Sequence, residues 1–256
     1  MSRYFKAKIA ENRPLNSNHN LLSLVTPDGT KEPLPGQFFM VEVNKGFDPI
    51  LKRAFSLFRR TSDGFQILYR IIGKGTSVLR SMKEGTEIDV LGPLGNHFRA
   101  PKQNQIPLII AGGIGIASVF PLIRKLEGRA YVFYGARTGK ELFMLDELKT
   151  ISKELVIATD DGSAGEKDTI IGVLNKFLKN RPSLIANYSI YSCGPRPMLE
   201  KIAGISAVHD IKAYVSLEEN MACGIGACLG CVVKTVNGHK RVCREGPVFD
   251  IREIEW

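Results

Sequence analysis

Residues 106–117 read IPLIIAGGIGIA, and this stretch decides the class of fold. An apolar run of strand length leads into the pair Gly112-Gly113, and after Gly115 the chain is apolar again with helical spacing. A strand, a glycine-rich turn and a helix in this order are typical of the nucleotide-binding turn of parallel α/β sheets. Ser118 stands where the G-x-G-x-x-G pattern has its third glycine, so the alternative is a two-glycine turn with only a structural role.

The same region raises the alternative of a membrane span, because residues 106–123 carry no charge over a length that approaches a transmembrane helix. Pro107, Pro121 and the three glycines interrupt this run. A strand, a turn and the start of a buried helix explain the segment better, and we expect no membrane span.

Strand-like and helix-like stretches alternate from residue 101 onward, which predicts a parallel sheet joined by right-handed crossovers. The expected strands cover residues 107–111, 130–136, 155–159, 188–194 and 211–217. The expected helices cover residues 116–126, 140–148, 170–178 and 197–203.

The first hundred residues differ, because short apolar or β-branched runs are separated by turn signals such as Pro27-Asp28-Gly29. Such a series is typical of an antiparallel β-barrel or sandwich. The expected strands cover residues 4–9, 21–26, 37–43, 54–58, 65–72 and 87–92, and a short helix is expected over residues 76–82.

The composition of the 256 residues is ordinary for a globular protein, with 44% hydrophobic and 24% charged residues, which excludes a disordered, collagen-like or coiled-coil chain. The net charge is +9 and the pI about 9.3, and the basic excess falls within residues 1–204. No run exceeds two adjacent basic residues, whereas a nucleic-acid-binding arm is normally denser, so we expect no nucleic-acid partner. The excess suits anionic dinucleotides, although scattered solvated lysines explain much of it equally well.

Four of the five cysteines are clustered near the C-terminus, at Cys223, Cys228, Cys231 and Cys243. The first three have the plant-type ferredoxin spacing of a [2Fe–2S] cluster, and the glycines between them allow a loop to wrap a cluster. The alternative is a structural zinc site, but zinc ribbons usually show two C-x-x-C knuckles and only one is present. Because residues 1–14 contain no apolar signal segment, we expect a metal centre in a cytoplasmic protein rather than disulfides.

These patterns together predict an α+β multidomain protein. Its expected parts are an N-terminal antiparallel β-barrel over residues 1–100, a central α/β parallel-sheet nucleotide-binding domain over 101–210 and a small C-terminal iron–sulfur lobe over 211–256. This last part is rich in glycine and cysteine and lacks an apolar core of its own.

Two short motifs in the β region would suit a flavin nucleotide. Arg53-Ala54-Phe55-Ser56 lies at a strand start, and Gly73-Lys74-Gly75-Thr76 opens the expected helix. An arginine can clamp a pyrophosphate, an aromatic ring can stack on a planar ring system, and a glycine-rich helix N-terminus can hold a phosphate. Each motif alone is weak, since a phenylalanine in a strand is more often core, but both in this order are more specific.

The ends of two further strands carry candidate nucleotide-binding residues. Thr159-Asp160-Asp161-Gly162-Ser163 follows the third strand of the α/β region, and an acidic residue there can bond ribose hydroxyls and repel a 2′-phosphate, which favours NAD over NADP. Ser192-Cys193-Gly194-Pro195 ends the fourth strand, where α/β sheets bind ligands. The alternative role of Cys193 is that of a buried small hydrophobic residue.

The motifs R-A-F-S, G-K-G-T, A-G-G-I-G and S-C-G-P, in this order, resemble those of ferredoxin–NADP reductase-like flavoproteins. The stretches E-E-N-M-A-C-G-I-G-A-C-L-G-C and V-C-R-E-G-P-V-F are similar to those of the electron-transfer subunits of class-1B dihydroorotate dehydrogenases. The resemblance covers essentially the whole chain. The sequence departs from the pattern at Asp168, where a small residue is expected after the T-D-D-G-S loop.

The resemblance implies one FAD, one [2Fe–2S] cluster and NAD as a substrate. It also implies a partner, an FMN-containing catalytic subunit that oxidises dihydroorotate in pyrimidine (UMP) biosynthesis, with two copies of each subunit in a heterotetramer. Electrons would pass from the partner's flavin through the cluster and the FAD to NAD⁺, because a flavin can exchange electrons singly or in pairs.

The resemblance also implies roles for individual residues. The cluster ligands would be the four clustered cysteines. The expected FAD-binding residues are Arg53, Ala54, Phe55, Ser56, Tyr69, Ile71, Gly73, Lys74, Gly75 and Thr76, and the expected NAD-binding residues are Gly112, Gly113, Gly115, Asp160 and Cys193. No side chain is expected to act as a catalytic acid or base.

Two alternatives stay open at this point. One is a related FAD/[2Fe–2S] NAD(P)H reductase subunit of a hydrogenase or sulfur reductase, which would have the same cofactors and another partner. The other is a basic zinc-stabilised binding module with no redox role. An exposed apolar patch near the cysteines would mark the footprint of a partner subunit.

Overall fold

The computed structural model describes residues 3–256, which divide into two compact units. The first contains the chain up to His97 together with Glu218–Val233 and His239–Pro247. The second contains Phe98–Leu217, Lys234–Gly238 and Val248–Trp256. The first boundary lies close to the expected one at residue 100. The contacts of residues 211–256 divide them between the two units, with Glu218–Val233 and His239–Pro247 in the first.

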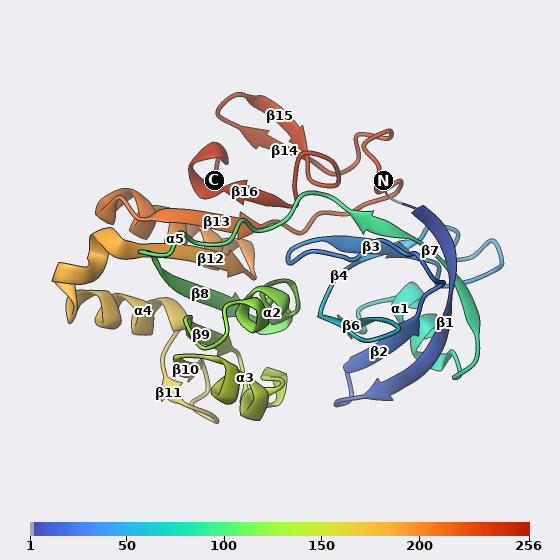
Figure 1. The fold of residues 1–256 in the computed structure, drawn as a ribbon, viewed down its shortest axis with the longest axis horizontal. Helices are drawn as coiled ribbons and strands as arrows, with labels where there is room; N and C mark the ends of the chain where they lie inside the picture. The colour runs from blue at the N-terminus through green and yellow to red at the C-terminus, as the bar shows by residue number, and fades with distance from the viewer. Residues whose placement is uncertain (1–2) are drawn as a thin grey trace. The chain divides into compact units, whose positions relative to one another are not determined.

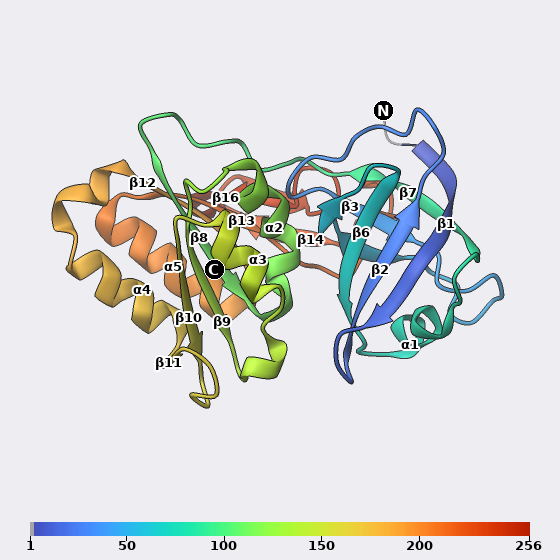
Figure 2. The ribbon, with the colours of Figure 1, turned by 60° about the horizontal axis from the view of Figure 1, so that its bottom comes forward.

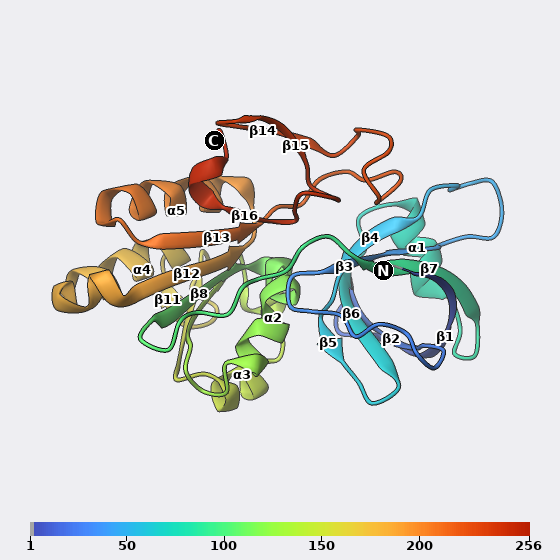
Figure 3. The same ribbon diagram turned by 45° about the horizontal axis from the view of Figure 1, so that its top comes forward.

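A curled antiparallel sheet builds most of the first unit, with the strand order β4-β3-β7-β1-β2-β6-β5 (Figures 1 and 3). Its concave side is filled by alternate apolar residues such as Ile9, Phe39 and Ile67. The elements are β1 (Arg3–Pro14), β2 (His19–Val25), β3 (Phe38–Val41), β4 (Arg53–Ser56), β5 (Arg59–Arg60), β6 (Gly64–Arg70), the helix α1 (Lys74–Ser81) and β7 (Glu87–Leu94). The antiparallel β domain expected from the sequence is confirmed in this curled form.

A second sheet of seven strands builds the second unit, in the order β11-β10-β9-β8-β12-β13-β16. Its neighbouring strands are parallel, except that β16 runs antiparallel to β13. Its strands are β8 (Ile106–Gly112), β9 (Tyr131–Ala136), β10 (Glu154–Thr159), β11 (Glu166–Lys167), β12 (Tyr188–Cys193), β13 (Lys212–Ser216) and β16 (Val248–Asp250). Its helices are α2 (Ile116–Lys125), α3 (Leu145–Ile151), α4 (Ile170–Lys179) and α5 (Arg196–His209), with 3₁₀ turns η1 (Gly113–Gly115), η2 (Gly139–Glu141), η3 (Pro182–Asn187) and η4 (Ile251–Glu253).

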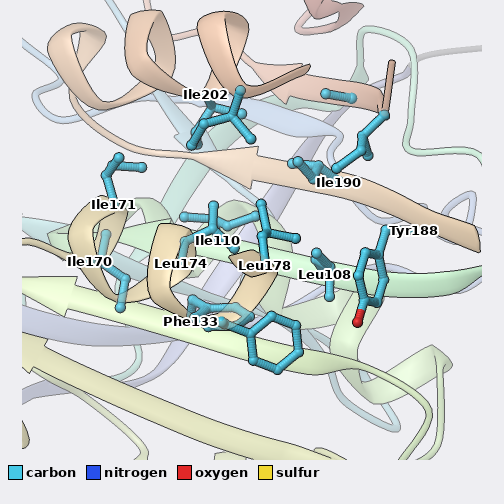
Figure 4. Packing of buried hydrophobic residues seen from close by; sticks show 14 of the residues in the cluster. Leu108, Ile110, Phe133, Ile170, Ile171, Leu174, Leu178, Tyr188, Ile190 and Ile202 are labelled. Carbon is cyan, nitrogen blue, oxygen red and sulfur yellow. The ribbon is translucent and has the colours of Figure 1, made fainter. Parts of the chain in front are cut away.

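Helices cover both faces of this parallel sheet: α2 and α3 lie on one face, and α4 and α5 lie on the other (Figure 2). The strands are therefore buried on both sides, which explains why they read as continuous apolar runs. Leu108, Ile110 and Ile190 of the sheet pack against Leu174 of α4 and Ile202 of α5 (Figure 4). This core holds the ends of β8 and β12 rigidly next to each other.

The structure differs from the sequence-based elements mainly where local geometry is unusual. The helix α3 begins at Leu145 rather than at residue 140, because η2 intervenes and Met144 adopts a left-handed conformation with φ 56°. The helix α5 continues to His209, beyond the expected end. Strands too short for a periodic signal were missed, among them β5, β11, β16 and the hairpin of β14 (Val232–Thr235) and β15 (Gly238–Arg241).

Candidate functional site

The two motifs expected to bind a flavin meet at strand β4. Arg53 is the first residue of this strand, and its guanidinium lies directly against the main chain of Gly75 in α1. A β-carbon at position 75 would stand 2.8 Å from Nε of Arg53, so a glycine at this position makes room for the guanidinium. Nη1 of Arg53 also donates a hydrogen bond of 2.5 Å to the carbonyl of Leu51, which holds the side chain from the opposite end.

The turn that opens α1 is organised by Thr76. Its Oγ1 accepts hydrogen bonds from the main-chain N–H groups of Ile72 and Gly73, at 3.0 and 3.2 Å, and donates one of 3.0 Å to the carbonyl of Gly73. The hydroxyl is thus committed to the turn itself, and Lys74 is paired with Asp48. The first main-chain N–H groups of α1, which lack intrahelical acceptors, are the donors that this turn offers to an anion.

Tyr69 supports the flavin motif from inside the sheet. Its ring is buried and meets the ring of Phe55 edge-on, with 5.6 Å between the ring centroids. Its hydroxyl donates a 3.0 Å hydrogen bond to Asn12 Oδ1, and burial raises the pKa of Tyr69 to about 12. Asn12 in turn donates to the carbonyl of Leu79 in α1. The side chain of Tyr69 therefore packs against Phe55 and braces α1.

The other residues of the flavin motifs lie around this contact. Phe55 is half-buried, as are Ala54, Ser56 and Ile71, whereas Gly73 and Lys74 are exposed. The half-buried positions on β4 leave one side of each residue open to a ligand.

The glycine turn after β8 packs main chain against main chain with the end of β12. A β-carbon on Gly115 would stand 2.4 Å from the carbonyl oxygen of Cys193, and one on Gly112 would stand 2.7 Å from Cδ of Pro195. Gly113 has φ +52° and faces open space, so a ligand can approach its main chain closely. Because the crossovers change direction between β8 and β12, these strand ends form the topological switch point at which open α/β sheets bind ligands.

Cys193 itself lies at this switch point with its side chain fully buried. Its main-chain carbonyl borders the glycine turn at Gly115.

The acidic loop after β10 contains two neighbouring aspartates, Asp160 and Asp161. The carboxylate of Asp161 accepts hydrogen bonds from the hydroxyl and the main-chain N–H of Ser163, at 2.6 and 2.9 Å, and these bonds lower the pKa of Asp161. Asp160 and Asp161 are both exposed. Asp168, which departs from the family pattern, forms an ion pair of 2.9 Å with Lys176 of α4.

Hydrogen bonds join the four clustered cysteines in two pairs. Cys223 and Cys228 share a hydrogen bond, and the main-chain N–H of Cys243 donates to Sγ of Cys231 at 3.4 Å. Burial acts to raise the pKa of Cys223, but main-chain N–H groups of residues 225, 227 and 228 point at its sulfur and bring the pKa down to about 6. Burial and the contact with Cys231 raise the pKa of Cys243 to about 12. Within residues 3–256, no three His, Cys, Asp or Glu side chains converge as ligands of a single metal ion.

One end of the cysteine loop is open to solvent. Cys228 is exposed, and beside it the apolar side chains of Ile225 and Leu229 are 52% and 61% exposed. Cys231 and Cys243 are buried. The loop itself is anchored at Gly224, where a β-carbon would stand 2.4 Å from Met40 of β3.

Sequence reasoning missed two residues that hold this loop, Arg241 and Glu245. They form an ion pair with two hydrogen bonds between their side chains, and Nη1 of Arg241 donates to the carbonyl of Gly226 between the cysteines. The signal in the sequence was the stretch V-C-R-E-G-P-V-F, in which Glu245 follows Cys243 by two positions.

Comparison with known proteins identifies the family. Residues 218–255 match the model of the iron-sulfur cluster binding domain of dihydroorotate dehydrogenase B, and residues 109–204 match the oxidoreductase NAD-binding domain. The chain is 34% identical to the dihydroorotate dehydrogenase B (NAD(+)) electron transfer subunit of Desulforamulus reducens, over 100% of both chains. It is 36% identical to the subunit of that name from Caldanaerobacter subterraneus, over 97% of each. The chain belongs to the family of dihydroorotate dehydrogenase B electron transfer subunits.

Solved structures share the fold of the chain. The chain is similar to a chain in the structure of an NADH-dependent reduced ferredoxin-NADP oxidoreductase, with a TM-score of 0.85 and 28% identity over 98% of this chain and 90% of the other. A ferredoxin reductase of carbazole 1,9a-dioxygenase shares the fold, with a TM-score of 0.69 and 24% identity over 82% of this chain and 67% of the other.

Membership of this family confirms several predictions from the sequence. The chain is an oxidoreductase subunit that carries electrons, and its cofactor classes are an iron–sulfur cluster, FAD and NAD. The iron–sulfur interpretation of the cysteines is confirmed over the zinc alternative. None of the helices in residues 3–256 combines the length and apolar character that a membrane crossing requires.

Proposed function

We propose that the chain passes electrons from an FMN-containing catalytic subunit, which oxidises dihydroorotate, to NAD⁺. The observation that carries this proposal is the cysteine loop over residues 223–243, whose paired and amide-bonded sulfurs suit a cluster and whose sequence matches the family. When bound, the nicotinamide exchanges two electrons as a hydride, the cluster exchanges one, and the flavin links the two processes.

The four cysteines Cys223, Cys228, Cys231 and Cys243 would ligate a [2Fe–2S] cluster. Two pairs of sulfurs suit a centre with two irons, each of which takes two protein ligands, better than a tetrahedral zinc ion, which needs all four sulfurs around one point. The main-chain N–H groups that point at Cys223 favour its thiolate, the form that binds metal.

Arg53 and the N-terminus of α1 would hold the pyrophosphate of FAD. The guanidinium and the first main-chain N–H groups of α1 lie together at Gly75, and both favour an anion. Phe55, together with Ala54, Ser56 and Ile71, would border the flavin ring. Thr76, Gly73, Lys74 and Tyr69 would act by shaping or bracing the turn.

The turn of Gly112, Gly113 and Gly115 would receive NAD at the switch point of the parallel sheet. Gly113 offers its main chain to the ligand, and Gly115 keeps the turn close to β12. The exposed carboxylate of Asp160 would bond ribose hydroxyls and disfavour a 2′-phosphate. Cys193 would contribute through its main chain.

The catalytic subunit would dock over the exposed end of the cysteine loop, at Ile225, Cys228 and Leu229. An exposed cysteine ligand between two exposed apolar side chains combines a short route for electrons with a surface that favours burial. The full assembly would contain two copies of each subunit and act in the cytoplasm.

A second candidate function comes from the similarity to the NADH-dependent reduced ferredoxin-NADP oxidoreductase. A chain of that kind would exchange electrons with ferredoxin and NADP(H) partners rather than with a dihydroorotate-oxidising subunit. The layout of cofactor motifs is compatible with both partners.

Affinity purification of the tagged chain from its native cells, followed by cofactor analysis of the partner, separates the two candidates. We expect a partner that contains FMN, and an assembly that reduces NAD⁺ with dihydroorotate as electron donor. A partner without FMN, with reduction driven by reduced ferredoxin instead, would favour the second candidate. A colourless protein with stoichiometric zinc would contradict both.

A further inference from the structure

Arg241 and Glu245 form a two-pronged ion pair next to the cysteine loop. Nε of Arg241 donates to Oε2 of Glu245 at 3.0 Å, and Nη2 donates to Oε1 at 2.5 Å. The main-chain N–H of Arg241 also donates to Oε2, at 2.7 Å. Both side chains are about two-thirds buried, with 28% and 32% exposed, so this pair is more fixed than an ordinary surface pair.

The remaining guanidinium nitrogen reaches into the cysteine loop. Nη1 of Arg241 donates a hydrogen bond of 2.9 Å to the carbonyl of Gly226, which lies between Cys223 and Cys228. Gly226 has φ +85°, and a β-carbon there would stand 2.7 Å from Cδ of Arg244, so the loop passes closely over this region. Arg241 thereby ties the loop to the strand β15, where Arg241 is the last residue.

Glu245 is also bonded to the segment that follows β7 of the antiparallel sheet. The carbonyl of Glu245 accepts a 2.8 Å hydrogen bond from Nδ2 of Asn96, which lies just beyond β7. The main-chain N–H of Asn96 donates to the carbonyl of Gly246 at 2.6 Å. A continuous chain of contacts therefore runs from the end of β7 through Glu245 and Arg241 to the loop.

The charges of the pair also act on the sulfurs. Arg241 stands two residues before Cys243, and the main-chain N–H of the next residue, Val242, donates to the carbonyl of Cys231 at 2.9 Å, so the positive charge lies on the segment that holds both cysteines. Glu245 compensates that positive charge from the side away from Gly226. A charge placed at a fixed position beside cluster ligands changes the relative stability of the oxidised and reduced forms.

We propose that Arg241 and Glu245 are positioning residues that fix the cysteine loop and set the reduction potential of its cluster, with Arg241 raising the potential and Glu245 opposing it. This inference rests on the proposed ligation by the four cysteines. It assigns a role to Glu245, which follows Cys243 and has no function in the proposed ligand set.

The two residues should act with opposite sign. Reduction adds one negative charge, so removing the guanidinium makes reduction less favourable, and removing the carboxylate leaves the guanidinium uncompensated and makes reduction more favourable. A residue with a merely structural role would not produce such a pair of opposite effects.

Redox titration of the cluster, followed by EPR of the full chain, tests the inference. At the wild-type midpoint potential, we expect Arg241→Gln to lower the ratio of reduced to oxidised cluster about tenfold or more. For a one-electron couple, a tenfold change in this ratio corresponds to a shift of the midpoint potential by about 59 mV. Glu245→Gln should raise the ratio, and Arg241→Lys, which keeps the positive charge but not the two-pronged contact, should fall between wild type and Arg241→Gln. The pair Arg196 and Glu200 on α5 has the same spacing, so Arg196→Gln and Glu200→Gln are matched controls that should leave the ratio unchanged.

Several outcomes would overturn the inference: shifts of the same sign in the two variants, no shift in Glu245→Gln, or equal shifts in the controls. If Arg241→Gln assembles no cluster, Glu245→Gln still decides the sign, and a lowered ratio there contradicts the inference. A wild-type chain without a [2Fe–2S] EPR signal would instead contradict the proposed function.

Discussion

At the scale of single residues, the site depends on its glycines as much as on its side chains. Gly75 gives the Arg53 guanidinium its position, and Gly113 gives a ligand access to the main chain. At the acidic loop, both aspartates are exposed, and the Ser163 hydroxyl donates a hydrogen bond to Asp161.

Replacing Gly75 by alanine should displace the guanidinium of Arg53 and weaken FAD binding. Charge-assisted hydrogen bonds contribute about 1.5–3 kcal/mol, so we expect roughly 10- to 100-fold weaker binding in a flavin fluorescence titration. The double variant Gly75→Ala with Arg53→Ala should bind little more weakly than Arg53→Ala alone, because both changes remove the same contact. Fully additive losses would show that Gly75 acts independently of Arg53.

Replacing Asp160 by alanine should relax the preference for NADH over NADPH. The loss of a charged hydrogen-bond acceptor should raise KM for NADH by roughly tenfold and leave that for NADPH unchanged or lower. Steady-state reduction of an artificial dye measures both constants without the catalytic subunit. Asp146→Ala, an exposed aspartate in the first turn of α3, is the control, and an equal preference in wild type and Asp160→Ala would contradict the assignment.

At the scale of elements, the proposed nucleotide site lies where the ends of β8 and β12 touch. The contact between Gly115 and the carbonyl of Cys193 joins main chain to main chain, so no side-chain rotation can relieve a clash there. In the β-sheet unit, Asp89 of β7 instead links its strand to β1 by side chains, accepting hydrogen bonds from Tyr4 at 2.5 Å and Lys6 at 3.0 Å.

Replacing Gly115 by alanine should destabilise the α/β unit as well as NAD binding. A β-carbon 2.4 Å from a main-chain oxygen forces the backbone to move, and overpacking of this kind costs roughly 1–3 kcal/mol. Urea unfolding measures this loss. Gly204→Ala in α5, where an added β-carbon meets nothing within 4 Å, should be neutral or stabilising, and an equal loss in both variants would contradict the explanation.

The contacts of Asp89 should make the β-sheet unit sensitive to acid. The hydrogen bond from Tyr4, with the contact from Lys6, lowers the pKa of Asp89, so its stabilisation is present above the ordinary value of 3.8 and is lost as the pH falls below it. Asp89→Asn should therefore lower the free energy of unfolding by about 1 kcal/mol at pH 7, and by progressively less as the pH falls below 3.8 and through the lowered pKa. Glu87→Gln on the same strand is the control, and a difference that does not shrink as the pH falls below 3.8 would contradict this assignment.

The elements also show what the sequence can and cannot predict. The strands of the parallel sheet and the motifs at Gly112 and Cys223 could be predicted, because each is a local pattern of apolar spacing or fixed residue intervals. The contact of Arg53 with Gly75 and the hold of Arg241 on Gly226 could not, because they depend on how distant segments meet. The start of α3 was missed for a different reason, since the left-handed Met144 has no residue-type signal.

At the scale of the whole molecule, two units and three cofactor classes serve a single electron-transfer path. The C-terminal segment contributes residues to both units. The basic excess lies in the part of the sequence that contains the proposed FAD and NAD sites, and this distribution suits their anionic pyrophosphates.

The most direct test of the central claim is NADH formation from dihydroorotate by the complex of this chain with its catalytic subunit, compared between wild type and Cys228→Ser. We predict that Cys228→Ser abolishes dihydroorotate-driven NADH formation while NADH-dependent reduction of the bound flavin continues at a similar rate. Unchanged NADH formation in a Cys228→Ser complex that lacks the cluster would contradict the account, because electrons would then reach NAD⁺ without passing through the cysteine loop.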